Sequence, residues 1–149
     1  MGIYLNPGNQ GFRESIRSKI YVDKTNLIAC TNEMMNTNDK YICVTRPRRF
    51  GKSMALEMLA SYYSSGCDSR ELFAGFKIEN DESFPEHLNQ CEVVYLNMQH
   101  FLIRADCGKV TKYLEQQVMG ELQEKYAHIL KGQDIGLATA LGKIYAKTD

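Results

Sequence analysis

The stretch YICVTRPRRFGKS, residues 41–53, decides the predicted fold. Its first residues, 41–45, are mostly apolar and β-prone, which predicts a buried strand, and the basic turn after them leads into a predicted helix. A strand, turn and helix in this order present backbone N–H groups and a helix N-terminus to an anion. We therefore expect a phosphate-binding loop, in which Lys52 contacts the β- and γ-phosphates, Ser53 holds Mg²⁺ and Gly51 keeps a Cβ atom away from the phosphates.

The standard form of this loop has a glycine five residues before its Gly-Lys-Ser, and here that position is Arg46. A basic surface turn between a strand and a helix is therefore an alternative interpretation of the same residues. The context favours the loop, because a β-prone run lies directly before it and an apolar helical pattern lies directly after it. That pattern places on one side of the helix the residues Ala55, Leu56, Leu59, Tyr62 and Tyr63.

Three blocks of sequence together resemble the predicted AAA-ATPase-like family of P-loop proteins. They are IYVDKT at residues 20–25, RPRRFGKS at residues 46–53 and VVYLNM at residues 93–98. In that family the Arg-Pro-Arg-Arg-Phe-Gly-Lys-Ser form is the usual version of the loop, so Arg46 is the expected residue. The resemblance runs from about residue 12 to about residue 101, and more loosely to the end of the chain.

The resemblance implies an α/β fold of the P-loop NTPase type, with three αβα layers and a mainly parallel sheet. Residues 41–45 and 93–98 would be parallel strands, and the chain would end before the acidic Walker B strand. A single domain over residues 1–149, the N-terminal half of such a module, suits a chain of this length. Residues 1–19, which contain Pro7, Gly8 and Gly11, are expected to form an irregular arm.

The resemblance also implies a nucleotide site for ATP and Mg²⁺, with the loop as its Walker A motif. The implied loop ligands are Arg46, Arg48, Arg49, Phe50, Gly51, Lys52 and Ser53. In many P-loop ATPases the segment before the first core strand lies beside the adenine, which makes Tyr21, Asp23 and Lys24 candidates for a base pocket. The alternative is that Asp23 only caps the helix that follows it.

Composition narrows the class of protein. Eighteen basic residues balance eighteen acidic ones, so the chain has no overall positive field that would attract nucleic acid, although Arg46, Arg48, Arg49 and Lys52 form a local positive cluster. The five cysteines are widely spaced and lack the pattern of a disulfide framework or a zinc site. The sequence has no membrane-spanning run and no recognisable targeting segment, which predicts a cytoplasmic protein.

Further along the chain, apolar residues at helical spacing predict a helix from about residue 109 to residue 132 and a second one over about residues 135–145. No apolar run closes in the acidic residue that a P-loop ATPase uses to order Mg²⁺ and the attacking water. We therefore expect ATP binding with slow hydrolysis or none from this chain alone.

The alternative class of function is a non-enzymatic interaction protein. Such a protein, for example a phage or mobile-element inhibitor, would reuse a degenerate ATPase scaffold to bind a protein or nucleic acid. A truncated parallel sheet would also leave an open edge, which predicts pairing with a partner or self-association.

Overall fold

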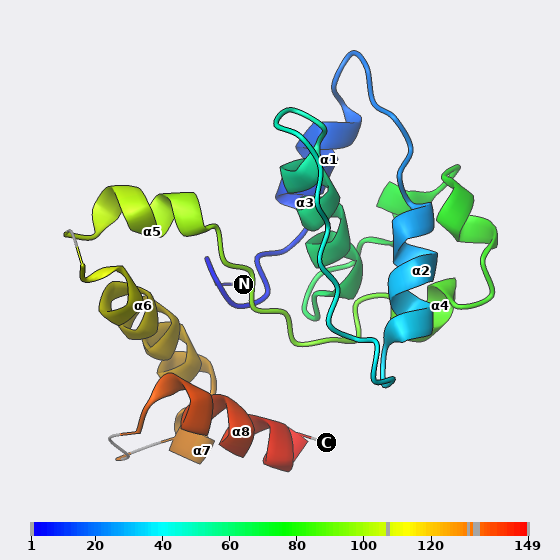
Figure 1. The fold of residues 1–149 in the computed structure, drawn as a ribbon. Helices are drawn as coiled ribbons and strands as arrows, with labels where there is room; N and C mark the ends of the chain where they lie inside the picture. The colour runs from blue at the N-terminus through cyan, green and yellow to red at the C-terminus, as the bar shows by residue number, and fades with distance from the viewer. Residues whose placement is uncertain (1, 107, 131, 133–134, 149) are drawn as a thin grey trace. The chain divides into compact units, whose positions relative to one another are not determined.

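The computed structural model describes residues 2–106, 108–130, 132 and 135–148. They divide into two compact units: residues 6–93, called unit 1, and residues 2–5 together with the residues from 94 onward, called unit 2. Figure 1 shows that the regular elements of both units are helices. Whether the two units fold as one cooperative domain stays a prediction.

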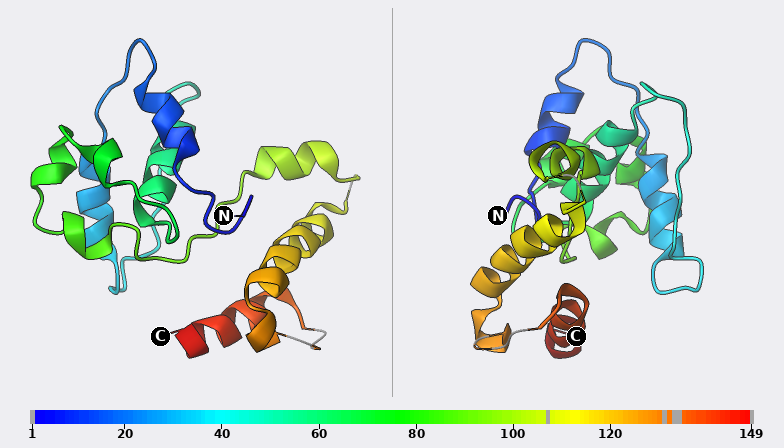
Figure 2. Two further views of the ribbon diagram at one scale, coloured as in Figure 1. Left: turned by 180° about the vertical axis from the view of Figure 1, so that it is seen from behind. Right: turned by 60° about the vertical axis from the view of Figure 1, so that its left-hand side comes forward.

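Unit 1 contains three helices of two or more turns and three short helical segments. They are α1 (Gln10–Ile16), α2 (Asn26–Met34), α3 (Lys52–Tyr63), η1 (Arg70–Phe73), η2 (Lys77–Asn80) and α4 (Phe84–His87). Helix α1 packs against α3, as two views show (Figures 1 and 2). The short segment η2 contacts both α2 and α4. The buried core between them is rich in aromatic residues: Phe12, Ile28, Met58, Tyr62, Leu72, Phe73, Ile78, Phe84 and Leu88.

The aromatic side chains of this core are in direct contact. The Phe73 ring stacks on Phe12 with centroids 4.9 Å apart and meets Tyr62 edge-on at 5.7 Å. All three side chains are fully buried. Because burial of apolar surface is the main favourable term in folding, this cluster is the principal stabilising feature of unit 1.

Helix α3 ends in a cap made by a distant asparagine. The Asn89 amide nitrogen donates hydrogen bonds to the carbonyls of Ser61 at 3.1 Å and Ser64 at 2.9 Å. Carbonyl groups at a helix C-terminus lack partners within the helix, so this side chain supplies partners that the end of α3 would otherwise lack. Asn89 itself adopts φ 57°, a conformation that asparagine tolerates better than most residues.

Unit 2 contains α5 (Met98–Arg104), α6 (Val110–Lys125), α7 (Ala127–Leu130) and α8 (Leu137–Thr148), with α7 and α8 packed against α6 (Figure 2). The Glu121 carboxylate on α6 accepts hydrogen bonds from the backbone N–H groups of Ile3 at 2.8 Å, Tyr4 at 3.0 Å and Leu5 at 2.8 Å. This contact holds residues 2–5 in unit 2. The buried core residues are Tyr4, Leu5, Phe101, Val118, Leu122, Tyr126, Ile129, Leu130, Ala140 and Ile144.

The expected three-layer αβα fold with a parallel sheet is wrong for the described part of the chain, which contains no sheet. The β-structure there consists of two isolated bridges, Leu5 with Val94 and Ser64 with Cys91. Residues 41–45 are all exposed and irregular, and residues 93–98 alternate between partly buried and exposed positions. Ile42 and Val93, one from each expected strand, line a cavity of about 370 Å³. A β-strand is stable only when neighbouring strands satisfy its backbone. Residues 41–45 have no bridge partner among the described residues, and residues 93–98 have only the single bridge of Val94 with Leu5.

Other expectations have mixed outcomes. The helical pattern expected from residue 109 onward is confirmed, but the first expected helix is divided at Tyr126 into α6 and α7, and the second is α8. The helix expected after Asp23 is confirmed as α2. The arm over residues 1–19 is not wholly irregular, because α1 forms within it and buries Phe12. Of the five cysteines, Cys107 lies outside the described residues, and the other four are free thiols.

Candidate functional site

The candidate loop leads directly into α3. Arg49 and Gly51 adopt left-handed backbone conformations, with φ 68° and 75°. Glycine tolerates such a φ, whereas an arginine there is uncommon, so the end of the loop holds a restricted geometry. Residues 46–50 are all exposed, and the loop therefore offers its backbone and side chains to solvent.

The N-terminus of α3 is an open set of hydrogen-bond donors. The first backbone bond of the helix runs from the N–H group of Ala55 to the Gly51 carbonyl at 3.0 Å, and no side chain caps the helix. The N–H groups of Lys52, Ser53 and Met54 find no acceptor among the described residues. Free N–H groups at the positive end of a helix dipole attract an anion.

Lys52 bends back over the start of the loop. Its ammonium group donates hydrogen bonds to the carbonyls of Arg46 at 2.5 Å and Pro47 at 2.9 Å. Ser53, in the first turn of α3, is exposed, and its hydroxyl makes no hydrogen bond to any described residue. The lysine charge and the free hydroxyl therefore both lie at the open end of the helix.

The arginines of the loop add uncompensated positive charge. Arg46, Arg48 and Arg49 are exposed, and none of them forms an ion pair with a described residue. A guanidinium group matches the geometry of phosphate oxygens and stays charged at all ordinary pH values. The loop thus concentrates positive charge in a chain with no net charge.

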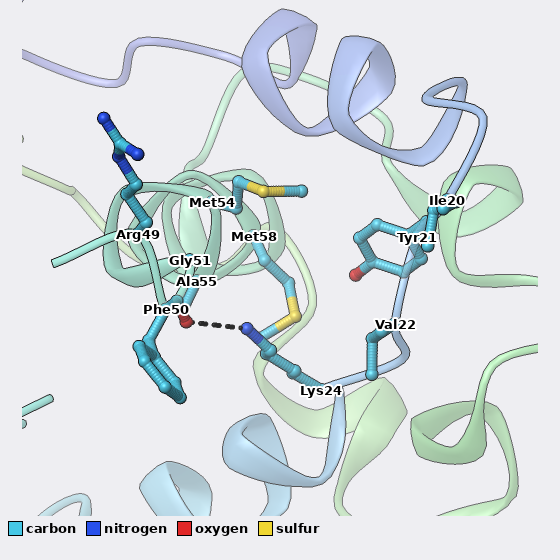
Figure 3. Close-up of a pocket in the computed structure, with 10 residues that line it drawn as sticks. All are labelled: Ile20, Tyr21, Val22, Lys24, Arg49, Phe50, Gly51, Met54, Ala55 and Met58. Atoms are coloured by element: carbon cyan, nitrogen blue, oxygen red, sulfur yellow. Dashed lines mark hydrogen bonds between the residues drawn. The ribbon is translucent and has the colours of Figure 1, made fainter. Parts of the chain in front are cut away.

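A cavity of about 250 Å³ lies beside the loop (Figure 3). One wall comes from residues 20–24 and includes Tyr21 and Lys24, and the other comes from the loop end and α3. In Figure 3 the Tyr21 ring faces Met54 and Met58 of α3 across the cavity. Burial raises the pKa of the Tyr21 hydroxyl to about 12, with a further contribution from the negative charge of Asp23.

Asp23 does not line this cavity. Its carboxylate accepts hydrogen bonds from the Thr25 N–H at 2.8 Å, the Thr25 hydroxyl at 2.7 Å and the Lys77 N–H at 3.1 Å. Partial burial opposes the charge of Asp23, but these hydrogen bonds and the charge of Lys77 together lower its pKa. Asp23 therefore fixes the turn before α2. It is not the N-cap of that helix, because the N-cap residue is Thr25.

The structure brings five of the ten predicted residues together around the cavity, while Asp23, Arg46, Arg48, Lys52 and Ser53 do not line it. Tyr21 and Lys24 meet Arg49, Phe50 and Gly51 around one cavity. Five further residues of its lining were not among the predicted site residues: Ile20, Val22, Met54, Ala55 and Met58. The spacing of Met54 and Met58, four residues apart on the helix that follows the loop, is a signal that could have found two of them.

No group of three or more His, Cys, Asp or Glu side chains within the described residues could hold a metal ion. Mg²⁺ differs from most metals in this respect, because it keeps several waters and binds one or two protein oxygens together with substrate phosphates. The free Ser53 hydroxyl beside the open end of α3 fits such a partial site. Separately, no described helix has the length and apolar character required to cross a membrane.

Three comparisons with known proteins bear on this chain. A search of curated proteins and a search of solved structures each found no match. A family model described as Predicted AAA-ATPase matches residues 7–148, which include the loop, the cavity residues and most of both units. The chain therefore belongs to the predicted AAA-ATPase-like family.

Proposed function

We propose that the loop binds ATP with Mg²⁺. The observation that carries this proposal is the open end of α3, where three unpaired N–H groups and the Lys52 ammonium adjoin a cluster of exposed arginines. A polyphosphate supplies the negative charge and the acceptor oxygens that these groups lack. Membership of a predicted ATPase family supports the same ligand.

Each loop residue would have a separate role with the phosphates. The N–H groups of Lys52, Ser53 and Met54 would donate to phosphate oxygens, and the Ser53 hydroxyl would hold Mg²⁺. Lys52 would exchange the carbonyls of Arg46 and Pro47 for the β- and γ-phosphates. The bound metal would neutralise part of the phosphate charge.

The cavity beside the loop is the proposed site of the base. Its lining is mainly apolar, with the Tyr21 ring on one wall and two methionines on the other. A flat aromatic base gains contact area between such side chains, and a tyrosine ring can stack on it. Residues 20–24 would thus bind the base while the loop binds the phosphates.

Isothermal titration calorimetry with Mg²⁺–ATP tests this proposal. Lys52→Ala should weaken binding about tenfold or more, because it removes a charge-assisted contact to phosphate. Lys19→Ala removes an exposed lysine outside the loop and the cavity, and it should bind like the wild type. Equal affinity of the wild type and Lys52→Ala, or no binding by either at millimolar nucleotide, would contradict the proposal.

We also propose that this chain alone hydrolyses ATP slowly or not at all. No carboxylate lines the cavity, and Asp23 is held by Thr25 and Lys77. Glu92 accepts hydrogen bonds from Asn6 at 2.8 Å and Ser65 at 2.7 Å, so it is engaged elsewhere. Without an acid that orders the attacking water, a large part of the catalytic effect is missing.

Steady-state release of phosphate from ATP, measured with purified protein of residues 1–149, tests this second expectation. Turnover at about one per second or faster, abolished by Lys52→Ala, would contradict it, since median enzymes turn over only about ten times per second.

A second candidate function is binding of a macromolecular partner. It is favoured by the exposed apolar side chains in and before the loop, where Tyr41 is 87% and Phe50 is 62% exposed. Apolar and arginine side chains together are typical of protein interfaces. Wild-type protein that binds no nucleotide in the calorimetric test would favour this candidate over the first.

A further inference from the structure

Lys24 contacts the loop from a distant part of the sequence. Its ammonium group donates a hydrogen bond to the carbonyl of Phe50 at 3.0 Å, across a separation of 26 residues (Figure 3). Phe50 precedes Gly51, whose left-handed conformation starts α3. The Phe50 carbonyl accepts no hydrogen bond from the backbone of α3, so Lys24 takes the place that a helical N–H group would otherwise fill.

The space above Gly51 is also occupied by this lysine. A Cβ atom added to Gly51 would lie 2.6 Å from the Lys24 ammonium nitrogen, while the nearest atom of any other residue, the Met54 sulfur, would be 4.0 Å away. Lys24 therefore touches the loop at Gly51, where an added Cβ atom would displace its ammonium group. Its contact with the loop is at the start of the helix, where the open N–H groups begin.

Lys24 is presented by a turn that is itself anchored to the core of unit 1. Asp23, on one side of it, accepts hydrogen bonds from Thr25 and from the Lys77 backbone. Tyr21, further back, packs against Phe76 at 5.4 Å and Phe12 at 6.1 Å. Because these contacts fix the segment that carries Lys24, its hydrogen bond ties the exposed end of the loop to the core of unit 1.

The loop has few other hydrogen bonds. Within residues 46–50, only backbone carbonyls form hydrogen bonds with described residues. At the start of the loop the Arg46 and Pro47 carbonyls accept from Lys52, and at its end the Phe50 carbonyl accepts from Lys24. Lys52 is expected to leave its carbonyls when phosphate binds, whereas Lys24 approaches from outside the loop. We infer that Lys24 is a positioning residue, which holds Phe50 and Gly51 in the conformation that opens the N-terminus of α3 to phosphate.

This inference refines the proposed phosphate site and rests on it, and its test is independent of nucleotide. Limited trypsin digestion of residues 1–149, without nucleotide, reports local opening of the loop through cleavage after Arg48 and Arg49. Lys24→Met keeps the length of the side chain and removes the donor, and it should speed this cleavage about fivefold, the effect of one net hydrogen bond. Lys24→Arg keeps a donor and should restore a rate close to that of the wild type.

Lys19→Met is the matched control, because Lys19 is exposed and does not line the cavity beside the loop. It should leave the rate of cleavage after Arg48 and Arg49 unchanged. The thermal midpoint should be the same in all four proteins.

Three results would overturn the inference. The first is a rate of cleavage after Arg48 and Arg49 in Lys24→Met that equals the wild-type rate. The second is an equal rise of this rate in Lys19→Met. The third is faster cleavage at all sites of Lys24→Met together with a lower thermal midpoint. The last of these would show a general role in the fold. Failure of wild-type protein to bind ATP would instead contradict the proposed function and leave the digestion result standing.

Discussion

The loop segment of unit 1, residues 40–51, and the core behind it are held by different forces. The core buries the Phe73, Phe12 and Tyr62 rings completely, and Phe73 stacks on Phe12 and meets Tyr62 edge-on, with centroids less than 6 Å apart in both pairs. The loop segment is exposed almost throughout, and lysine side chains supply the hydrogen bonds to its residues 46–50. The site is thus placed on an exposed element of low local stability that continues directly into α3, a helix of the stable core.

The largest expected difference between the two regions comes from one phenylalanine in each. Phe73→Ala should lower the free energy of unfolding by about 3–5 kcal/mol, because it removes a fully buried ring and leaves a cavity. Phe50→Ala should change it by less than about 0.5 kcal/mol, because that side chain is 62% exposed. Urea denaturation followed by circular dichroism measures both, and the absence of tryptophan makes this the suitable probe.

Similar losses for the two variants would contradict the comparison. A loss of several kcal/mol in Phe50→Ala would show that the loop packs into the core in solution. A loss below about 1 kcal/mol in Phe73→Ala would show that the aromatic cluster is not the main source of stability in unit 1.

Two glycines separate backbone strain from the contact with Lys24. Gly51 and Gly66 have similar left-handed conformations, with φ 75° and 81°, but only the Cβ of an alanine at 51 would meet a neighbour. Both Gly51→Ala and Gly66→Ala should destabilise unit 1 by about 1 kcal/mol, the usual cost of that conformation for an L-residue. Only Gly51→Ala should also speed trypsin cleavage after Arg48 and Arg49, since it displaces Lys24.

Equal cleavage of the two glycine variants would show that the contact above Gly51 does not hold the loop. If the two variants differ in their free energy of unfolding but are cleaved at the same rate, the difference between them comes from backbone strain alone.

The helices could be predicted from the sequence because their hydrogen bonds are local. The apolar spacing of residues 110–130 indicates the helical stretch that forms α6 and α7, although not the break between them, and the apolar pattern after the loop indicates α3. The predicted face of α3 was only partly right: Tyr62 is buried, but Leu56 is 52% exposed and the core contact comes from Met58. Which side of a helix is covered depends on distant elements such as α1.

The predicted sheet failed because a strand needs partners that its own sequence does not contain. Ile42, Val44 and Val94 have strong β-propensity, yet all three are exposed and the first two have no bridge partner in the described chain. The β-propensity of these residues therefore indicates extended segments, but it does not indicate that they form the hydrogen-bond ladder of a sheet. A parallel pairing would require contacts between residues about fifty positions apart, which no spacing rule specifies.

The candidate site was predictable in part. The order of glycine, lysine and serine before a helix indicated where the open N-terminus of α3 and its lysine would lie. The approach of Lys24 to Phe50 could be expected only from the resemblance, because nothing in the spacing joins two residues so far apart. The direction of Asp23 could not be predicted at all, since it depends on Lys77 in η2.

The smallest expected effect is the pH dependence of the free energy of unfolding that comes from Asp23, in the turn that carries Lys24. The pKa of Asp23 is lowered in the folded protein, so the carboxylate contributes stability above its ordinary pKa, near 3.8, and that contribution is lost as the pH falls through the lowered value. Asp23→Asn should remove this dependence and cost less than about 1 kcal/mol at neutral pH, since the group is partly exposed to solvent. Asp39→Asn is the control, because the Asp39 side chain is exposed and accepts no hydrogen bond from a described residue. Urea unfolding at a series of pH values from 6 down to about 2 measures the slope. A slope that Asp23→Asn leaves unchanged, or that Asp39→Asn reduces equally, would show that the turn presenting Lys24 does not depend on this carboxylate.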